Sequence, residues 1–549
     1  MLLTALAILS IYAAARIARV VPVPEAVARL GEPLESRWVP WVVGAITGCL
    51  VWWVAGSMNR PPIIHDEAAY LLQAGIFARG LWALPAAPLP AFFEQFHVLV
   101  APVVAAKYPP GQALVLVPGV WLGAPELVPV LLSGLTGALI FLLARRVAGG
   151  WVALVTWLVW VDAFPSIYRR ATYLSEDSTT AAWLVAWWAF MAWRAHGKTR
   201  SLVIVAVAIA FVAITRPLTA VALAAPIAVV VIRRAWVARA SGRRAWAPLA
   251  AAAVAGTAVV AIMPVWNAHV TGSYRVSPLS VYTTAYLPWD RPGFGVNTPR
   301  ATRALPPDLL AVGNVFYTWH RDFAPAAEPQ ILVNRLYAIA SDMWVGPMLA
   351  FLPFAILGLG ALGIEGWFAL ASLGVLVGCY LCYAHPAAYT VYYLEAEPVL
   401  AFLTAVGTVA TVAILAERVP FGAWRRGVAR LRGGATLVVA GVTIALIHWA
   451  IPTLRAERDL DMIEVGYYRA VQSVFAKIHD PKAVVFVRYG PGHNPNLSLV
   501  HNVPDPAHAP LWVVYDRGAE NAALLRFARD RVGYVFDEDA WTLTRVSPR

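Results

Sequence analysis

The stretch 127–165, LVPVLLSGLTGALIFLLARRVAGGWVALVTWLVWVDAFP, contains two apolar runs separated by a short turn that carries two arginines. A run of about 20 apolar residues forms a helix long enough to cross the roughly 30 Å hydrocarbon core of a membrane. Two such runs joined by so short a turn indicate a helical hairpin that crosses the membrane twice. This part of the chain is therefore not predicted to be a soluble globular domain.

The rest of the chain continues the same pattern. It has 549 residues, of which 60% are hydrophobic and 13% are charged, whereas a soluble domain carries about 25% charged residues. Twelve apolar runs predict membrane-spanning helices, so the predicted fold is a polytopic α-helical membrane protein. The runs lie at 2–20, 39–57, 127–145, 149–165, 178–194, 201–215, 217–233, 247–268, 341–357, 362–383, 393–414 and 434–452.

The arginines predict how the chain is oriented, because cytoplasmic loops carry an excess of Lys and Arg. Five basic clusters fall on one side if the runs alternate, and that side is predicted to be the cytoplasm. The clusters are Arg16, Arg19, Arg29 and Arg37; Arg145 and Arg146; Arg194, Lys198 and Arg200; Arg233, Arg234, Arg239, Arg243 and Arg244; and Arg418, Arg425, Arg426, Arg430 and Arg432. Topology thus explains the net charge of +12, and no nucleic-acid partner is predicted.

The remaining segments are predicted to lie outside an inner or plasma membrane. A transmembrane domain (1–455) carries the outer loops 58–126 and 269–340, and residues 456–549 form a small α/β domain facing the periplasm or exterior. In that tail AVVFVR (483–488), LWVVYD (511–516) and VGYVFD (532–537) read as short strands, NAALLRFARD (521–530) as a helix and GPGHNPN (490–496) as a loop. The short apolar segment 111–123 suits a helix in the membrane interface.

Two acidic pairs lie at the predicted outer edge of the membrane. Asp66 and Glu67 follow the second run in PPIIHDEAAYLLQAGIFARG (61–80), and Glu176 and Asp177 precede the fifth in YRRATYLSEDSTT (168–180). Carboxylates at that depth are costly unless they are paired or functional. Helix capping is the alternative reading for both pairs, because each stands where a helix is predicted to begin. The residues alone leave both readings open.

Basic and aromatic residues gather at the same edge. Lys107, in AAKYPPGQ on the first outer loop, supplies positive charge, although a snorkelling interfacial lysine is the alternative. Further candidates are Tyr70, Arg169, Arg170, Arg216, Tyr392 and Tyr393, and an aromatic belt is the alternative for the last two. His97, His320 and His385 lie on separate segments, so no metal or other cofactor is predicted, with a divalent metal near Asp66 as the alternative.

The ordered set HDEAAYLLQAGIFARG, KYPPG, LLARRVAGG and YLSED resembles the GT-C superfamily of membrane glycosyltransferases over residues 39–234, with a weaker echo in 391–407. The chain is similar to the protein O-mannosyltransferases and to the aminoarabinose transferases of lipid A. This resemblance implies a polyprenyl- or dolichyl-phosphate sugar as donor, an inverting transfer and an active site on the outer face. The acceptor would be a lipid, a glycan or a protein.

The resemblance also implies roles for single residues. Asp66, with Glu67 beside it, matches the catalytic acidic residue of the family, and Lys107 matches the lysine that contacts the donor phosphate. Such a transfer needs a carboxylate to deprotonate the acceptor hydroxyl, cations for the departing phosphate and a groove for the lipid tail. The chain departs from the family at Thr390 and Val391, where a basic residue commonly precedes the tyrosines.

Two other functions fit a protein of this composition. One is a transporter or flippase of a lipid-linked sugar, and the other is a non-catalytic assembly or sensor subunit. A transporter is expected to show internal repeats and ionisable groups near the middle of the membrane. Here most ionisable residues lie at the ends of the runs, although Asp162 is close to the interior of one. A carboxylate at position 66 separates the enzyme from the alternatives, which do not need it.

Overall fold

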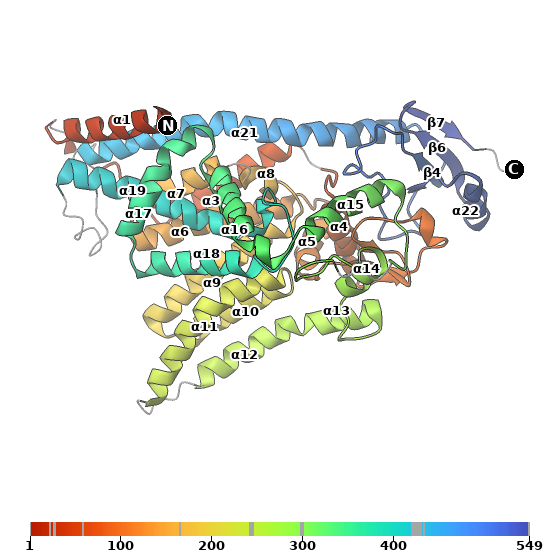
Figure 1. Ribbon diagram of the computed structural model, residues 1–549, viewed down its shortest axis with the longest axis horizontal. Helices are drawn as coiled ribbons and strands as arrows, with labels where there is room; N and C mark the ends of the chain where they lie inside the picture. The colour runs from red at the N-terminus through yellow and green to blue at the C-terminus, as the bar shows by residue number, and fades with distance from the viewer. Residues whose placement is uncertain are drawn as a thin grey trace.

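The computed structural model describes residues 2–20, 24–25, 29–56, 60–163, 166–240, 246–296, 301–418, 431 and 434–546. Arg243, Arg244, Arg425, Arg426, Arg430 and Arg432 of the predicted cytoplasmic clusters lie outside these residues. Figure 1 shows a helix bundle at one end of the molecule and a small sheet at the other, with one long helix, α21, running along both. The outer loops fill the space between the bundle and that sheet.

A helix lies at each of the twelve predicted runs. The helices of the bundle are α1 (Leu2–Ala18), α3 (Val39–Ala55), α6 (Leu127–Ala148), α7 (Gly150–Asp162), α8 (Ser166–Arg170), α9 (Ser175–His196), α10 (Thr199–Ala213), α11 (Pro217–Ala240), α12 (Trp246–Val260), α13 (Ile262–Thr271), η4 (Gly346–Phe351), α17 (Leu352–Ala361), α18 (Ile364–Tyr380), η5 (Thr390–Ala396), α19 (Glu397–Glu417) and α21 (Gly434–Phe475). A short 3-10 helix, η1 (Glu32–Glu35), precedes α3.

Five of these helical stretches are long and apolar enough to cross a membrane among the described residues, and a bent pair would make a sixth. The bent pair is Pro325–Met343 with Gly346–Ala361, at 108°. Shorter apolar helices stand at other predicted runs, among them Val39–Ala55, Gly150–Asp162 and Ile364–Tyr380. The chain is therefore a helical membrane protein, and the number of twelve spans stays a prediction.

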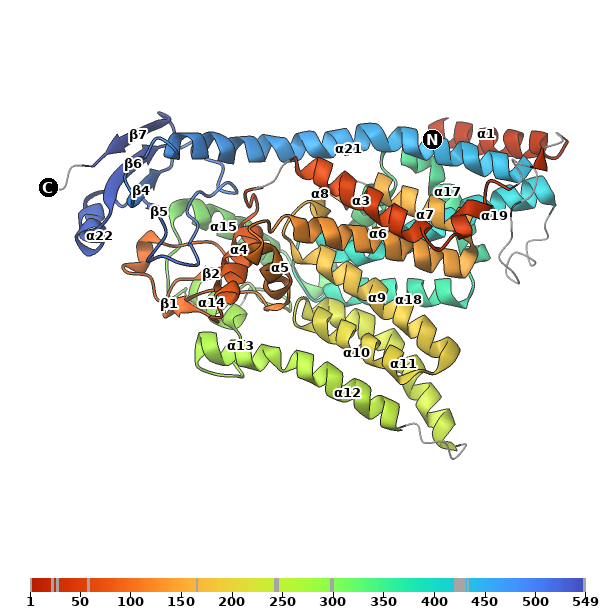
Figure 2. The same cartoon turned by 180° about the vertical axis from the view of Figure 1, so that it is seen from behind.

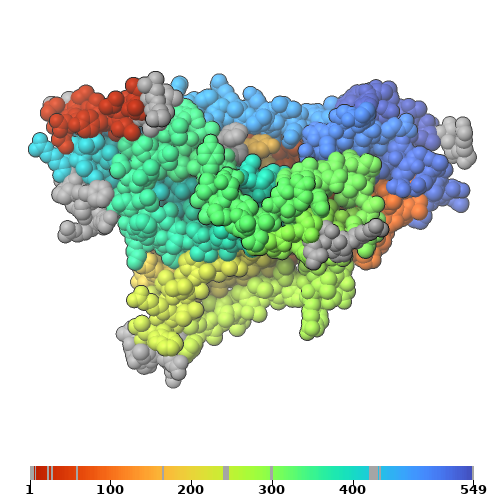
Figure 3. Space-filling model, in the orientation of Figure 1, coloured from red at the N-terminus to blue at the C-terminus, as the bar shows by residue number. Residues whose placement is uncertain are grey.

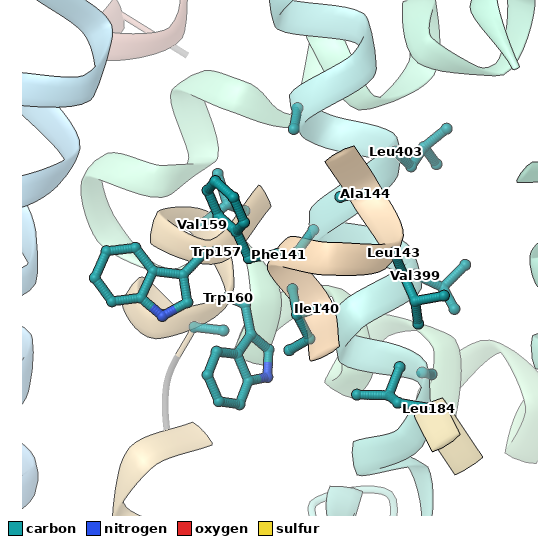
Figure 4. Close-up of a cluster of buried hydrophobic side chains, with 14 of the residues drawn as sticks. Ile140, Phe141, Leu143, Ala144, Trp157, Val159, Trp160, Leu184, Val399 and Leu403 are labelled. Carbon is teal, nitrogen blue, oxygen red and sulfur yellow. The ribbon is translucent and has the colours of Figure 1, made fainter. Parts of the chain in front are cut away.

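The core of the bundle is apolar and lies around α6, α7 and α19 (Figure 4). Phe141 and Trp160 are fully buried there. Helices α17 and α19 cross so closely that a Cβ on Gly407 would lie 1.7 Å from the carbonyl oxygen of Phe354. Small residues allow membrane helices this approach, so Gly407 fixes the crossing.

Helix α21 was predicted to end at 452, but it continues to Phe475 and has 42 residues. At 1.5 Å per residue it is about 63 Å long. Its second half carries buried carboxylates. Glu457 accepts a hydrogen bond from the backbone N–H of Tyr168, at 2.9 Å, and Asp461 pairs with Arg60 at 2.6 Å. These contacts hold the outer half of α21 against the edge of the bundle.

The outer loops contain their own short elements. They are α4 (His65–Ala78), β1 (Leu84–Pro85), η2 (Pro90–Phe92), β2 (Val98–Leu99), β3 (Val103–Ala106), α5 (Gly111–Trp121), α14 (Pro278–Tyr286), α15 (Pro307–Arg321), η3 (Pro325–Ala327) and α16 (Glu328–Met343). The strands β1, β3 and β2 form an antiparallel sheet in that order. The predicted interfacial helix at 111–123 is α5. Figure 2 shows α4, α5 and this sheet at the outer end of the bundle.

The tail contains the predicted strands and helix: β4 (Ala483–Arg488), β5 (Leu511–Tyr515), α22 (Asn521–Phe527) and β6 (Val532–Asp537), with the short η6 (Gly518–Glu520) before α22. A fourth strand, β7 (Thr542–Arg545), was not predicted. The sheet order is β5-β4-β6-β7, with β4 parallel to β5 and β6 and with β7 antiparallel to β6. Because the proposed boundary at 455 falls within α21, a separate C-terminal domain stays a prediction.

Candidate functional site

Asp66 lies at the start of α4, where the outer loops meet the bundle. Helix α4 begins at His65, and its N-cap residue is Ile64, so Asp66 is not the capping residue. The hydroxyl of Tyr108 donates a hydrogen bond to Asp66 Oδ1 at 2.5 Å, and Nε2 of His97 lies 3.5 Å from Oδ2. The side chain of Asp66 is 33% exposed. Asp66 is thus held by two neighbours and remains open on one side.

Glu67 has the opposite surroundings and is 0% exposed. Its carboxylate accepts hydrogen bonds from the backbone N–H groups of Ile63, Ile64 and Tyr173 at 2.8 to 2.9 Å. It also pairs with Arg60 at 2.9 Å. Helix capping, the alternative reading of this pair, therefore describes the contacts of Glu67 and not those of Asp66.

The partners of Asp66 control its charge. Partial burial alone would raise the pKa of Asp66, but His97, Tyr108 and Lys107 together hold that pKa below its usual range. Burial, reinforced by the charge of Lys107, lowers the pKa of His97 to about 4. At neutral pH Asp66 is therefore a carboxylate and His97 is neutral. Since the carboxylate accepts, Nε2 of His97 carries the hydrogen.

Lys107 follows β3 and lies beside Asp66. Its ammonium group is 3.8 Å from Asp290 and lies 5.3 and 5.0 Å from the ring centroids of Tyr108 and Tyr282. Burial lowers the pKa of Lys107, an effect that Asp290 and Asp66 partly oppose. The backbone N–H of Lys107 also donates to the carbonyl of His97, at 2.9 Å. We call Asp66, His97, Lys107 and Tyr108 the Asp66 cluster.

A second cluster surrounds Arg216, at the turn between α10 and α11. Its Nη1 lies 3.5 Å from Glu176 and 3.7 Å from Glu395. Its guanidinium lies 5.6 Å from the ring centroid of Tyr392. These residues come from the start of α9, from the α10–α11 turn and from η5. We call Arg216, Glu176, Glu395 and Tyr392 the Arg216 cluster.

Tyr70 joins the two clusters. Its ring stacks on that of Tyr108, with centroids 4.9 Å apart. Burial and the carboxylates of Glu176 and Asp66, one from each cluster, raise the pKa of Tyr70. The two clusters are therefore neighbours, between the outer loops and the outer ends of α9 and η5.

Other predicted site residues have different neighbours. Arg170 pairs with Asp177 at 2.8 Å and lies 3.7 Å from Glu397. Asp177 also accepts a hydrogen bond from Ser133, at 2.9 Å. The hydroxyl of Tyr393 contacts Nε2 of His385 at 3.1 Å. These contacts join bundle elements to one another, and substrate binding by Arg170, Asp177 and Tyr393 stays a prediction.

Several members of the site carry little signal in the sequence. Tyr108 had one clue, because it directly follows Lys107 in KYPPG. His97, considered only as a metal ligand, stands alone in a loop, with a backbone φ of 67°. Asp290 is a single carboxylate far from Asp66 along the chain, and Glu395 follows the candidates Tyr392 and Tyr393, with Glu397 two residues further on. Left-handed backbone at a non-glycine residue is uncommon and often marks a functional position, but the sequence does not reveal it.

The tail reaches this site as well. Residues 495–505, which we call the tail segment, lie along α4 and the turn before His97. Nε2 of His65 donates to the carbonyl of Pro495 at 3.0 Å. The side chain of Asn502 donates to the carbonyl of Phe93 at 2.9 Å, and its backbone N–H donates to Gln95 Oε1 at 2.8 Å. The tail segment therefore contacts neighbours of both Asp66 and His97.

The described residues contain no group of three or more His, Cys, Asp or Glu side chains that could hold a metal ion.

Comparison with known proteins bears on the fold. No family model and no curated protein matches the sequence. Two solved structures of ArnT from Cupriavidus metallidurans match, one bound to undecaprenyl phosphate and one in the apo state. Their TM-scores are 0.52 and 0.53, and their sequences are 14% and 15% identical to this one. Each match covers 92% of this chain, and the two matches cover 91% and 94% of the ArnT chains.

Arabinosyltransferase EmbB from Mycobacterium smegmatis also matches, with a TM-score of 0.42 and 11% identity over 86% of this chain and 46% of that one. The fold comparison rests on ArnT, which matches along nearly the whole length of both chains. The chain has the fold of ArnT, and its resemblance to the GT-C membrane glycosyltransferases is confirmed at the level of the fold.

Proposed function

We propose that this protein is an inverting glycosyltransferase that moves a sugar from a polyprenyl-phosphate donor to an acceptor at the outer face of the membrane. The observation that carries the proposal is the Asp66 carboxylate, partly open at the head of α4 and bordered by Lys107. A solved structure of ArnT, which has the same fold, contains undecaprenyl phosphate. That lipid phosphate matches the chemistry of the two clusters.

Asp66 acts as the general base in this proposal. The hydroxyl oxygen of the acceptor attacks the anomeric carbon of the donor, the bond from that carbon to the phosphate oxygen breaks, and the hydroxyl proton passes to Asp66. Tyr108 and His97 orient the carboxylate and keep it ionised. A donor phosphate beside Lys107 adds negative charge, which raises the pKa of Asp66 and makes it a stronger base.

Lys107 and Arg216 balance the charge of the departing phosphate. Lys107 is 3.8 Å from Asp290, and Arg216 is 3.5 Å from Glu176, so neither cation makes a short contact with its carboxylate neighbour. An incoming phosphate offers each a shorter, charge-assisted hydrogen bond. In a partly dehydrated region such contacts stabilise the charge that develops on the leaving group.

Glu67 is proposed to position Asp66 and not to react itself. All its contacts are internal, to Arg60 and to three backbone N–H groups. These contacts fix the first turn of α4 against the start of α9. This revises the expectation that both carboxylates of the pair are catalytic.

The proposal is tested by incubating the purified protein with a panel of polyprenyl-phosphate sugars. The expected result is release of the polyprenyl phosphate and transfer of the sugar, with Asp66→Asn as the inactive control. A flippase, the alternative function, would move the same lipid across a vesicle membrane without cleaving it, and without needing Asp66. Translocation without cleavage would therefore replace this proposal by the alternative.

A further inference from the structure

The helix bundle contains an apolar cavity that lies apart from the Asp66 cluster. It is lined by side chains of α6, α7, α9, α18 and α19, among them Ile140, Leu143, Leu184, Phe190, Phe368 and Val399. Figure 4 shows Ile140, Leu143, Leu184 and Val399 on neighbouring helices of this region. This apolar lining favours a hydrocarbon chain as the ligand.

The depth of the cavity matches one leaflet of a membrane. Both Leu184 and Arg194 line it, and they are ten residues apart on α9. Ten residues of α-helix span about 15 Å, which is half of the roughly 30 Å hydrocarbon core. The cavity runs toward the end of α9 that carries Arg194, which is the predicted cytoplasmic end. The Arg216 cluster contacts the opposite end of α9, at Glu176.

The end of the cavity at Arg194 is basic. Arg194 lines it and lies 3.4 Å from Glu365, and both side chains are about one third exposed, at 34 and 36%. Arg146 donates to the carbonyl of Met191, and Arg234 donates to the carbonyls of Trp193 and Arg194. Three arginines against one glutamate leave a net charge of about +2 here. Basic pockets between membrane helices on the cytoplasmic side bind anionic lipid headgroups.

We propose that this cavity binds one acyl chain of an anionic glycerophospholipid from the cytoplasmic leaflet, with the lipid phosphate against Arg146, Arg194 and Arg234. The acyl chain lies between α9 and α18, over the ring of Phe368, which stacks on Phe190 at 5.2 Å. The acyl chain of a lipid in the cytoplasmic leaflet begins at the arginines and ends near the middle of the membrane. The polyprenyl donor starts at the opposite face, so the two lipids occupy different ends of the bundle.

Native mass spectrometry of the delipidated protein in detergent tests this assignment. Titration with phosphatidylglycerol should give a one-to-one complex at least about tenfold tighter than titration with phosphatidylcholine, because the headgroup charge differs. Replacing Arg146 and Arg194 together by Gln should weaken phosphatidylglycerol binding about tenfold. Arg145→Gln is the matched control, because that guanidinium binds the carbonyls of Leu34 and Ser36. Equal binding of both lipids, or equal loss in the control, would overturn the headgroup site.

A second variant tests the acyl-chain site. Ala369 lines the cavity, and Ala369→Phe should fill it and abolish the one-to-one complex while the melting temperature stays within a few degrees of the parent. If that variant elutes as an aggregate, Ala369→Leu replaces it and should weaken the complex severalfold. Unchanged binding in the folded variant would contradict the proposal. Displacement of phosphatidylglycerol by equimolar undecaprenyl phosphate would do so as well, since the cavity would then hold the donor tail.

Discussion

Asp66 and Glu67 are neighbours in the sequence with opposite roles in the structure. Successive residues of an α-helix point about 100° apart. At the start of α4 the Glu67 carboxylate is therefore buried, whereas the Asp66 carboxylate is partly exposed. The sequence predicts a functional acidic pair but not which member is free. That choice depends on Arg60 and on the backbone N–H of Tyr173, which lies 106 residues further along the chain.

His97 predicts a pH effect. Its Nε2–H faces Asp66 and lowers the pKa of that carboxylate. In His97→Gln this effect is reduced, so the pKa of Asp66 rises and activity is lost at a higher pH as the medium is acidified. The pH profile of kcat/KM measures the shift. His320→Gln, which alters the contact with Asp290 and not that with Asp66, should leave the acid limb in place. An unmoved acid limb in His97→Gln would remove His97 from the account.

Lys107 predicts an effect on the donor. In Lys107→Ala the charge-assisted contact to the phosphate is lost, and KM for the donor should rise by about tenfold to a hundredfold. Lys107→Arg should recover part of the loss, because a planar guanidinium keeps the charge but not the compact shape of an ammonium. Steady-state kinetics with varied donor measure both variants. Unchanged donor kinetics in Lys107→Ala would transfer the role to Arg216.

At the level of elements, α21 shows why the sequence predicted a helix that is too short. Its apolar run ends at 452, and the buried stripe then continues through Glu457 and Asp461 before it returns to Val465 and Tyr468. The spacing of three or four residues is helical. However, two carboxylates interrupt the hydrophobic pattern, and their partners, Tyr168 and Arg60, are distant in sequence. The strands of the tail were predicted because their apolar runs are short and uninterrupted.

The tail segment predicts that Asn502 positions the site. Its side-chain amide donates hydrogen bonds to the carbonyl of Phe93 and to the side chain of Gln95. Gln95 lies two residues before His97. Asn502→Ala removes these hydrogen bonds, each worth about 1 kcal/mol, so the protein should still fold. We expect kcat to fall about tenfold with little change in KM for the donor, together with the same acid-limb shift as in His97→Gln. A purely structural role would leave that limb unmoved.

A matched control for Asn502→Ala is Asn496→Ala. Asn496 is exposed. The hydrogen bonds that the structure describes for its side chain and its backbone N–H go to the side chain of Asn494, in the same turn. This variant should keep parental kcat and KM. Parental kinetics in Asn502→Ala would show that the tail segment does not position the site.

For the whole molecule, composition and periodicity predicted a helical membrane protein and placed helices at all twelve runs. They placed Asp66, Lys107, Arg216 and Tyr392 at the same outer edge but did not predict the contacts that bring them together around Tyr70, because those residues are spread over more than 300 positions. Such proximity comes from helix packing, which local patterns do not encode. Asp66 and Lys107 were candidates both from the residues themselves and from the resemblance to a known family, whereas the contacts of His97 and Tyr108 with Asp66 were not predicted.

Sidedness can be tested with cysteines placed one at a time in a background without the native ones. Ser280 and Ser473 are exposed on the outer part, and Ala195 is exposed at the predicted cytoplasmic end of α9. A membrane-impermeant maleimide should label Ser280→Cys and Ser473→Cys in intact cells, and Ala195→Cys only after permeabilisation. Labelling of Ala195→Cys from outside would invert the topology and move the Asp66 cluster to the cytoplasmic face.

The central claim is that Asp66 removes the acceptor proton, and Asp66→Asn tests it most directly. Asparagine keeps the size of the side chain and still accepts a hydrogen bond from Tyr108, so the variant should fold and bind donor. Loss of a general base costs about 10²- to 10⁴-fold in rate, so sugar transfer under saturating donor should fall by at least about a hundredfold at unchanged melting temperature. A folded Asp66→Asn protein that transfers sugar at nearly the parental rate would contradict the mechanism.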